Sequence, residues 1–278
     1  MDNKKFHNNL IVSTSPHIVT DEDTTKLMGT VLLAMLPALV ASTYIFGARV
    51  LLLAAVCIVA SVGFEWIYNM LAKKPPTISD LSAAVTGLLI AFNVPSSFPL
   101  WMAVIGCFVA IVVIKQLYGG IGRNFVNPAI TARIFLFISF AAQMTTWPLP
   151  RMAAKTDAVT GPTPLALVAG GASKSDLPSN MDMFLGFTGG SLGEVSALAL
   201  LVGGLFLIWR KVISPAIPCA FLGTVFVIAL AYYKGDFNMA IFHLCAGGVM
   251  LGAFFMATDY VTSPKLTKGQ IMFGIGCG

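Results

Sequence analysis

Charged residues are scarce in this 278-residue sequence, at 10% of the chain against about 25% in a typical soluble domain. Hydrophobic residues make up 57% of it. This balance excludes an ordinary soluble domain and indicates an integral membrane protein, so its organisation follows from its membrane spans. The formal net charge of +5 is then a marker of topology, and we expect no nucleic-acid partner.

Several motifs are missing as well. The five cysteines form no Cys-x-x-Cys pair and all lie in apolar runs, which predicts small buried side chains and no disulfide framework. The alternative is an intramembrane metal or cluster site shared with a partner chain; we expect no metal site within this chain. The first 25 residues contain no apolar core of a cleavable signal peptide. No Walker A motif is present, so any nucleotide oxidation would occur in another subunit.

Apolar runs of about 20 residues predict an all-α polytopic membrane protein. The expected spans are 26–46, 49–71, 80–95, 98–115, 128–145, 194–209, 215–233 and 238–257. A ninth run starts near Gln270, but the sequence stops at Gly278, so we expect an incomplete C-terminal end or a last piece that lies in the membrane interface. The expected organisation is an N-terminal segment (1–25), a first membrane half (26–145), a loop (146–193) and a second membrane half (194–278).

The distribution of basic residues predicts the orientation. With the N-terminus in the cytoplasm, eleven basic residues, Lys115 among them, fall on the cytoplasmic side and five on the outside. Cytoplasmic loops of membrane proteins carry the excess of Lys and Arg. We therefore expect a cytoplasmic N-terminus, with the loop 146–193 on the outer face.

Two stretches predict irregular backbone beside the spans. In 118–133, three glycines weaken any helix, and Pro128 restricts Asn127 to an extended conformation. The stretch 255–268 contains Asp259 and a Ser-Pro break. Irregular backbone at membrane depth persists only where protein buries it or where it lines a cavity. The two interpretations are a tight cytoplasmic loop and a binding site that includes Asn124 and Asn127.

Three acidic residues are candidates for ion coupling. Asp80 and Glu194 each open an acid-x-Ser-Ala motif before an apolar run, on opposite sides of the predicted membrane, as expected for inverted repeats. The alternative is that both motifs are helix N-caps. Glu65 lies within the second predicted span, and it is either an interfacial carboxylate that snorkels or part of an ion path. His243, alone in its span, is expected to be a hydrogen-bonded core residue.

The predicted outer loop contains Asp157-Ala-Val-Thr160-Gly161-Pro-Thr163. This stretch resembles the flavinylation motif of bacterial membrane flavoproteins, although Pro162 stands where that motif usually has Ala. The resemblance implies that an extracytoplasmic flavin transferase esterifies Thr163 to the phosphate of FMN. A threonine hydroxyl can form such a phosphoester, and glycine and proline keep a loop open to the modifying enzyme.

Further motifs in the same order resemble one family over essentially the whole chain. They are Ser-Pro-His at 15–17, Asp-Leu-Ser-Ala-Ala-Val-Thr-Gly from 80, Gly-Arg-Asn-Phe-Val-Asn-Pro-Ala from 122 and Gly-Glu-Val-Ser-Ala-Leu-Ala from 193. They are similar to the RnfD family of membrane subunits of the Rnf complexes, which is related to NqrB of the sodium-pumping NADH:quinone reductase.

The resemblance implies ten spans in two inverted halves. It also implies an electron-carrying subunit, in the bacterial cytoplasmic membrane, of a complex with other Rnf subunits. That complex couples ferredoxin oxidation and NAD⁺ reduction to Na⁺ or H⁺ transport. Covalent FMN at Thr163 and a non-covalent riboflavin near Asn124 and Asn127 would be its cofactors, and membrane lipid would surround it.

Two other interpretations fit the composition. One is a small-solute channel or transporter with inverted repeats and no redox role, which leaves the Thr163 motif unexplained. The other is a structural anchor for flavin-bearing subunits, in which Thr163 stays unmodified. Bound flavin in the purified protein would distinguish an electron carrier from a channel or transporter. Covalent flavin would distinguish an electron carrier from a structural anchor.

Overall fold

The computed structural model describes residues 23–75, 77–151, 160–194 and 196–278. Within these ranges the regular structure is helical, and an isolated antiparallel bridge joins Pro148 to Thr160. This confirms the predicted all-α class. The helices are α1 Thr24–Phe46, α2 Arg49–Leu71, η1 Ile78–Asp80, α3 Ser82–Phe92, α4 Leu100–Phe108, η2 Val109–Gln116, α5 Pro128–Ser139, α6 Ala141–Met144, α7 Pro164–Ala169, η3 Lys174–Asp176, α8 Asn180–Leu185, α9 Ala197–Trp209, α10 Ala216–Tyr232, α11 Phe237–Cys245, α12 Val249–Leu251, η4 Gly252–Met256 and α13 Thr267–Cys277.

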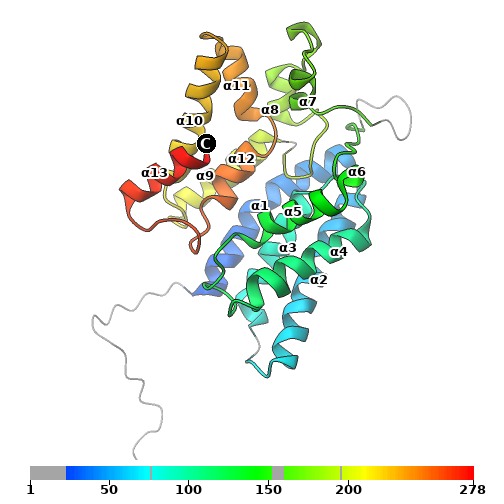
Figure 1. Ribbon diagram of the computed structural model, residues 1–278, viewed down its shortest axis with the longest axis vertical. Coiled ribbons are helices and arrows are strands. Elements are labelled where there is room, and N and C mark those ends of the chain that lie inside the picture. The colour runs from blue at the N-terminus through cyan, green and yellow to red at the C-terminus, as the bar shows by residue number, and fades with distance from the viewer. Residues whose placement is uncertain (1–22, 76, 152–159, 195) are drawn as a thin grey trace, which may run out of the picture.

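Helix α3 is the buried centre of the molecule. All 11 of its residues are buried, as expected for a helix that is apolar on every side. It packs closely on α2, because a Cβ at Gly87 would lie 2.6 Å from the backbone oxygen of Cys57. At about 1.5 Å per residue, α3 is roughly 16 Å long, which is shorter than a bilayer core. In Figure 1, α2 to α6 gather on one side of the molecule and α9 to α13 on the other.

The two sides meet at both α1 and α3. Helix α1 crosses α9 so tightly that a Cβ at Gly203 would lie 2.1 Å from the backbone oxygen of Ala34. The segment that leads into α9 bonds to the C-terminal end of α3, where the amide of Gly193 donates to the carbonyl of Phe92 at 2.8 Å. The C-terminal end of α3 is therefore a junction between the two predicted halves.

Several predicted spans are interrupted. Helices α1 and α2 are long and apolar enough to cross a membrane. Helix α11 and the α12–η4 segment are apolar enough only when taken together, and they are bent by 66° at residues 246–248, as in a broken span or a re-entrant loop. The loop 117–127 is irregular, with glycines at positive φ, as the sequence predicted. The break at 246–248 and the two π-helical segments, η2 and η4, were not predicted.

The isolated cysteines and the lone histidine can now be placed. All five thiols are free, in agreement with the prediction of no disulfide framework. Cys57, Cys107 and Cys245 are buried, whereas Cys219 and Cys277 are exposed, so uniform burial was wrong for two of the five. His243 is partly buried and its Nε2 lies 3.1 Å from the hydroxyl of Tyr233, which confirms a hydrogen-bonded histidine.

Candidate functional site

Thr163 lies at a loop end that backbone contacts hold in place. The bridge between Pro148 and Thr160 and a hydrogen bond from the amide of Gly161 to the carbonyl of Trp147, at 3.1 Å, close this loop. Thr163 is the N-cap of α7, and its hydroxyl oxygen accepts from the amide of Ala166 at 3.2 Å. Thr163 is only partly buried, so its side chain is partly accessible at the surface. Asp157 of the same motif lies outside the described residues.

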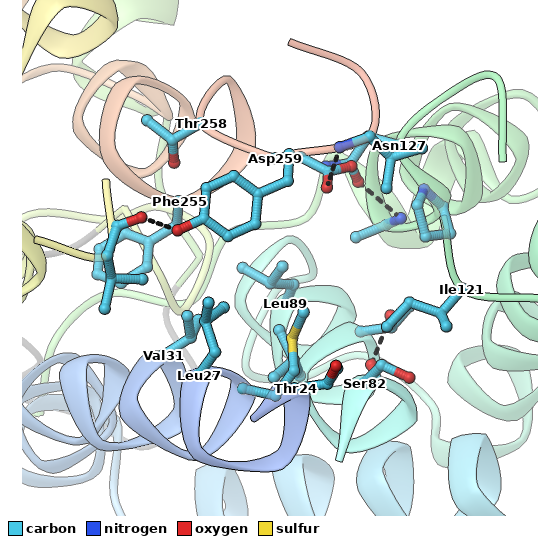
Figure 2. Close-up of a pocket in the computed structure, with 18 of the residues that line it drawn as sticks. Thr24, Leu27, Val31, Ser82, Leu89, Ile121, Asn127, Phe255, Thr258 and Asp259 are labelled. Atoms are coloured by element: carbon cyan, nitrogen blue, oxygen red, sulfur yellow. Dashed lines mark hydrogen bonds between the residues drawn. The ribbon is translucent and has the colours of Figure 1, made fainter. Parts of the chain in front are cut away.

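A cavity of about 340 Å³ opens between the two sides of the molecule, beside the N-terminal end of α3. Most of its lining is apolar, with a few polar groups, which is the usual composition of a small-molecule site. Figure 2 shows Thr24 and Ser82 on one wall and Asn127, Thr258 and Asp259 on the wall opposite. The volume falls within the range of about 300–1,000 Å³ that is typical of ligand pockets.

Both predicted pocket asparagines line this cavity, but the protein already uses part of their hydrogen-bonding capacity. Asn127 is the N-cap of α5, and its side-chain oxygen accepts from the amides of Ala129 and Ile130 at 3.0 and 3.3 Å. The side-chain nitrogen of Asn124 donates to the carbonyl of Val126 at 3.0 Å. The nitrogen of Asn127 also donates to the carbonyl of Met256 at 3.4 Å, so each amide nitrogen keeps a second hydrogen to donate.

Asp259, from the second irregular stretch, lies on the same cavity wall, in the loop after η4. Burial raises the pKa of its carboxyl group, and hydrogen bonds from the amide of Val261 and the hydroxyl of Thr262 partly oppose that effect. Both stretches that the sequence marked as irregular therefore meet at one cavity, as a binding site requires.

Glu65 lies in a buried polar cluster next to the cavity. Both of its carboxylate oxygens lie 3.1 Å from Nζ of Lys115, and the two side chains are 1% and 4% exposed. Oε1 of Glu65 also accepts from Gln116 at 2.8 Å and from Thr77 at 2.7 Å. The snorkelling interpretation of Glu65 was wrong, because the carboxylate points into protein and is fully hydrogen-bonded.

The same cluster includes Asp80. Nζ of Lys115 lies 2.5 Å from Oγ of Ser82, and that hydroxyl donates to Oδ1 of Asp80 at 2.6 Å. Asp80 Oδ1 also accepts from the amide of Ser82, the first residue of α3, at 2.8 Å. Asp80 therefore lies at the helix start, but the N-cap position itself is Leu81. The count of basic residues placed Lys115 in a cytoplasmic loop, but Lys115 is buried. Without it, ten basic residues lie on the predicted cytoplasmic side and five on the predicted outer side.

Glu194 belongs to a separate cluster at the C-terminal end of α3. Its Oε1 lies 3.1 Å from the guanidinium of Arg133, which also donates to the side-chain oxygen of Asn93 at 3.0 Å. Ser196, and not Glu194, caps α9 through the amide of Ala199. The two acid-x-Ser-Ala motifs are thus used differently, and α3 separates the two acids.

Sequence reasoning missed Lys115 and Arg133 as partners of the acids. Each basic residue lies in an apolar run. Its position could have indicated a buried ion pair, because an ionisable group inside a membrane usually has a partner. Which acid it meets depends on helix packing, since 50 residues separate Glu65 from Lys115 and 61 separate Arg133 from Glu194.

Known proteins match the chain along nearly its whole length. The chain is 48% identical to the D subunit of the Na⁺-translocating ferredoxin:NAD⁺ oxidoreductase complex of Acetobacterium woodii, over 97% of this chain and 83% of that protein. It is 41% identical to the D subunit of the proton-translocating ferredoxin:NAD⁺ oxidoreductase complex of Clostridium ljungdahlii, over 96% and 83%. It is 37% identical to the D subunit of the ion-translocating oxidoreductase complex of Rhodobacter capsulatus, over 95% and 82%.

Residues 11–278 also match the family described as NQR2, RnfD, RnfE. The resemblance drawn from the motifs is thereby confirmed by identity along the whole length, and it agrees with the all-helical fold and its apolar helices. The chain belongs to the NQR2, RnfD, RnfE family of membrane proteins.

Proposed function

We propose that this protein is the electron-carrying membrane subunit of a complex that couples electron transfer between ferredoxin and NAD⁺ to ion transport. It carries one flavin covalently on Thr163 and a second, non-covalent flavin in the cavity beside α3. The observation that carries the proposal is the placement of Thr163 as a partly exposed N-cap of α7 in a chain that also has a ligand-sized cavity. All three relatives are named as subunits of ion-translocating oxidoreductase complexes. The names of two of these complexes specify ferredoxin and NAD⁺.

The cavity suits a flavin ring in two respects. Its apolar walls, which include Leu27, Val31 and Phe255, match the faces of a flat aromatic ring. Its polar groups, including the amides of Asn124 and Asn127, match the donors and acceptors along a ring edge. Each lost hydrogen bond of this kind costs about 1–3 kcal/mol, so the asparagines would set the orientation of the ring.

The double replacement Asn124→Leu/Asn127→Leu is expected to abolish the acid-extractable flavin of the purified protein while the covalent flavin stays. Asn238→Leu, at an exposed position away from the cavity, is the matched control and should keep both. Absorbance of the supernatant after acid precipitation measures the extractable flavin, and the intact mass of the protein measures the covalent flavin. Extractable flavin that survives the double replacement, or is absent from wild type, contradicts the cavity assignment.

We also propose that Glu65, Asp80 and Glu194 take part in ion coupling, from the two ends of α3. Buried or half-buried carboxylates at membrane depth are costly and are usually functional. Glu65→Gln, Asp80→Asn and Glu194→Gln should each lower the number of ions moved per electron in reconstituted vesicles and leave the flavins bound. An unchanged ratio in all three variants would reduce these acids to capping and structural roles.

We propose a cytoplasmic N-terminus and an outer loop 146–193, on the ten-to-five distribution of basic residues. An impermeant thiol reagent applied to intact cells should label a cysteine at Ser173 and not one at Asn3, in a background without the native cysteines. The reverse pattern would invert the topology and would remove Thr163 from the reach of an extracytoplasmic transferase. The N-terminal site lies outside the described residues, so this test does not depend on its structure.

A further inference from the structure

The Glu65–Lys115 cluster contains a continuous chain of hydrogen bonds that leads from the surface to the cavity. Asp80, which is partly exposed, accepts from the hydroxyl of Ser82, and that oxygen accepts in turn from Nζ of Lys115. Ser82 and Lys115 both line the cavity, whereas Glu65 does not. Three groups that can exchange protons therefore stand in line between solvent and the cavity wall.

Local backbone geometry places Lys115 there. It lies in the π-helical segment η2, where the amide of Leu117 bonds to the carbonyl of Val112, five residues earlier. A π-helical turn winds more loosely than an α-helix, so the consecutive residues Lys115 and Gln116 both reach Glu65. π-bulges occur frequently at functional sites. Glu65 receives four hydrogen bonds and acts as the fixed counter-charge of the ammonium.

An electron that arrives in a low-dielectric cavity needs a compensating positive charge. We propose that Lys115 is the proton donor to the cavity occupant, and that Ser82 and Asp80 reload it with a proton from solvent. This inference rests on the proposed function, because it takes the occupant to be a flavin reduced by the covalent flavin on Thr163.

The protons and charges balance along this route. An electron from the reduced covalent flavin adds one negative charge to the occupant, and a proton from Nζ of Lys115 cancels it. The neutral amine then takes the proton of the Ser82 hydroxyl, and Ser82 takes a proton that solvent delivers through the carboxylate of Asp80. Asp80 is a carboxylate again at the end of the step. A hydroxyl is both donor and acceptor, so Ser82 relays the proton by rotating its O–H bond.

Other charged and titratable groups face the same cavity. Asp23 before α1 and Asp259 and Tyr260 after η4 contribute to its lining. Neither Asp23 nor Asp259 is joined to Lys115 by a hydrogen bond within the described residues, whereas Asp80 is linked to it through one hydroxyl. The relay is therefore assigned to Asp80.

Replacing Lys115 by arginine separates the loss of a proton by this side chain from its positive charge. Lys115→Arg keeps a cation and its donors beside Glu65, but a guanidinium does not deprotonate in proteins. Ser82→Ala interrupts the relay and leaves the ammonium in place. Ser61→Ala is the matched control, because Ser61 is also buried against α3 and its hydroxyl has no hydrogen-bond partner within the part of the chain that the structure describes.

The experiment measures the reduction of the cavity flavin by transient absorbance, and proton uptake by a pH-indicator dye, in purified full-length protein. Lys115→Arg and Ser82→Ala should slow proton uptake about 10²-fold or more, the usual contribution of a positioned proton donor. Because Lys115 and Ser82 line the cavity, the flavin content of each variant is measured and the proton uptake is expressed per bound flavin. Ser61→Ala should match wild type in every measurement.

The possible outcomes distinguish a failure of the proton relay from a failure of the proposed function. Uptake rates within threefold of wild type in both variants, with flavin bound, overturn the relay and leave the proposed function standing. Slow uptake in Ser82→Ala alone would make Lys115 a fixed charge and would overturn its role as donor. Wild-type protein without an extractable flavin would overturn the proposed function, and the relay with it.

Discussion

Replacing Thr163 by Ala is expected to remove the covalent flavin completely, so that the protein band no longer fluoresces under ultraviolet light in a denaturing gel. The reason is chemical, because alanine has no hydroxyl to form the phosphoester. The intact mass should lose the FMN increment at the same time. No other single replacement in this chain is expected to change the covalent cofactor content as much.

The N-cap role of Thr163 requires a second variant. Loss of a threonine N-cap costs about 1 kcal/mol, so Thr163→Ala could also loosen α7. Thr163→Asn keeps a capping oxygen without a hydroxyl and should lose the flavin equally, whereas Thr163→Ser should keep it. Thr146→Ala, in an exposed turn outside the motif, should remain fluorescent. Covalent fluorescence that persists in Thr163→Asn would place the attachment elsewhere.

The largest expected loss of stability follows from breaking the buried pair of Glu65 and Lys115. Lys115→Met leaves the Glu65 carboxylate buried without its cation, which costs about 3–5 kcal/mol. For a chain of this size that corresponds to a fall of roughly 10 °C in the unfolding temperature in detergent. The double replacement Lys115→Met/Glu65→Met removes both charges and should recover most of the loss.

The exposed pair of Lys174 and Asp236 is the control for this stability measurement. The Lys174 side chain is 72% exposed, and exposed pairs contribute only about 0–1 kcal/mol. Lys174→Met should therefore barely change the unfolding temperature. If Lys115→Met behaved like Lys174→Met, or if the double replacement were no more stable than the single one, the pair would not be buried as described.

The sequence by itself determined the class of the protein and the position of most of its helices. Few charges and apolar runs of about 20 residues favour a bundle of helices in lipid, because a helix satisfies its backbone hydrogen bonds internally. The predicted spans 26–46 and 49–71 match α1 and α2 closely for this reason. Glycines and prolines marked the irregular loop 117–127 because their backbone preferences are local.

Tertiary structure alone decided how the charges are used. The sequence left Glu65 as either a snorkelling carboxylate or part of an ion path and placed Lys115 in a loop, because each prediction used only the neighbours of that residue along the chain. Packing of α2 against η2 brings them within 3.1 Å, and packing around α3 separates Asp80 from Glu194. Sequence periodicity records which residues avoid water, but the partner of a buried charge depends on which helices meet, and that is a long-range property of the fold.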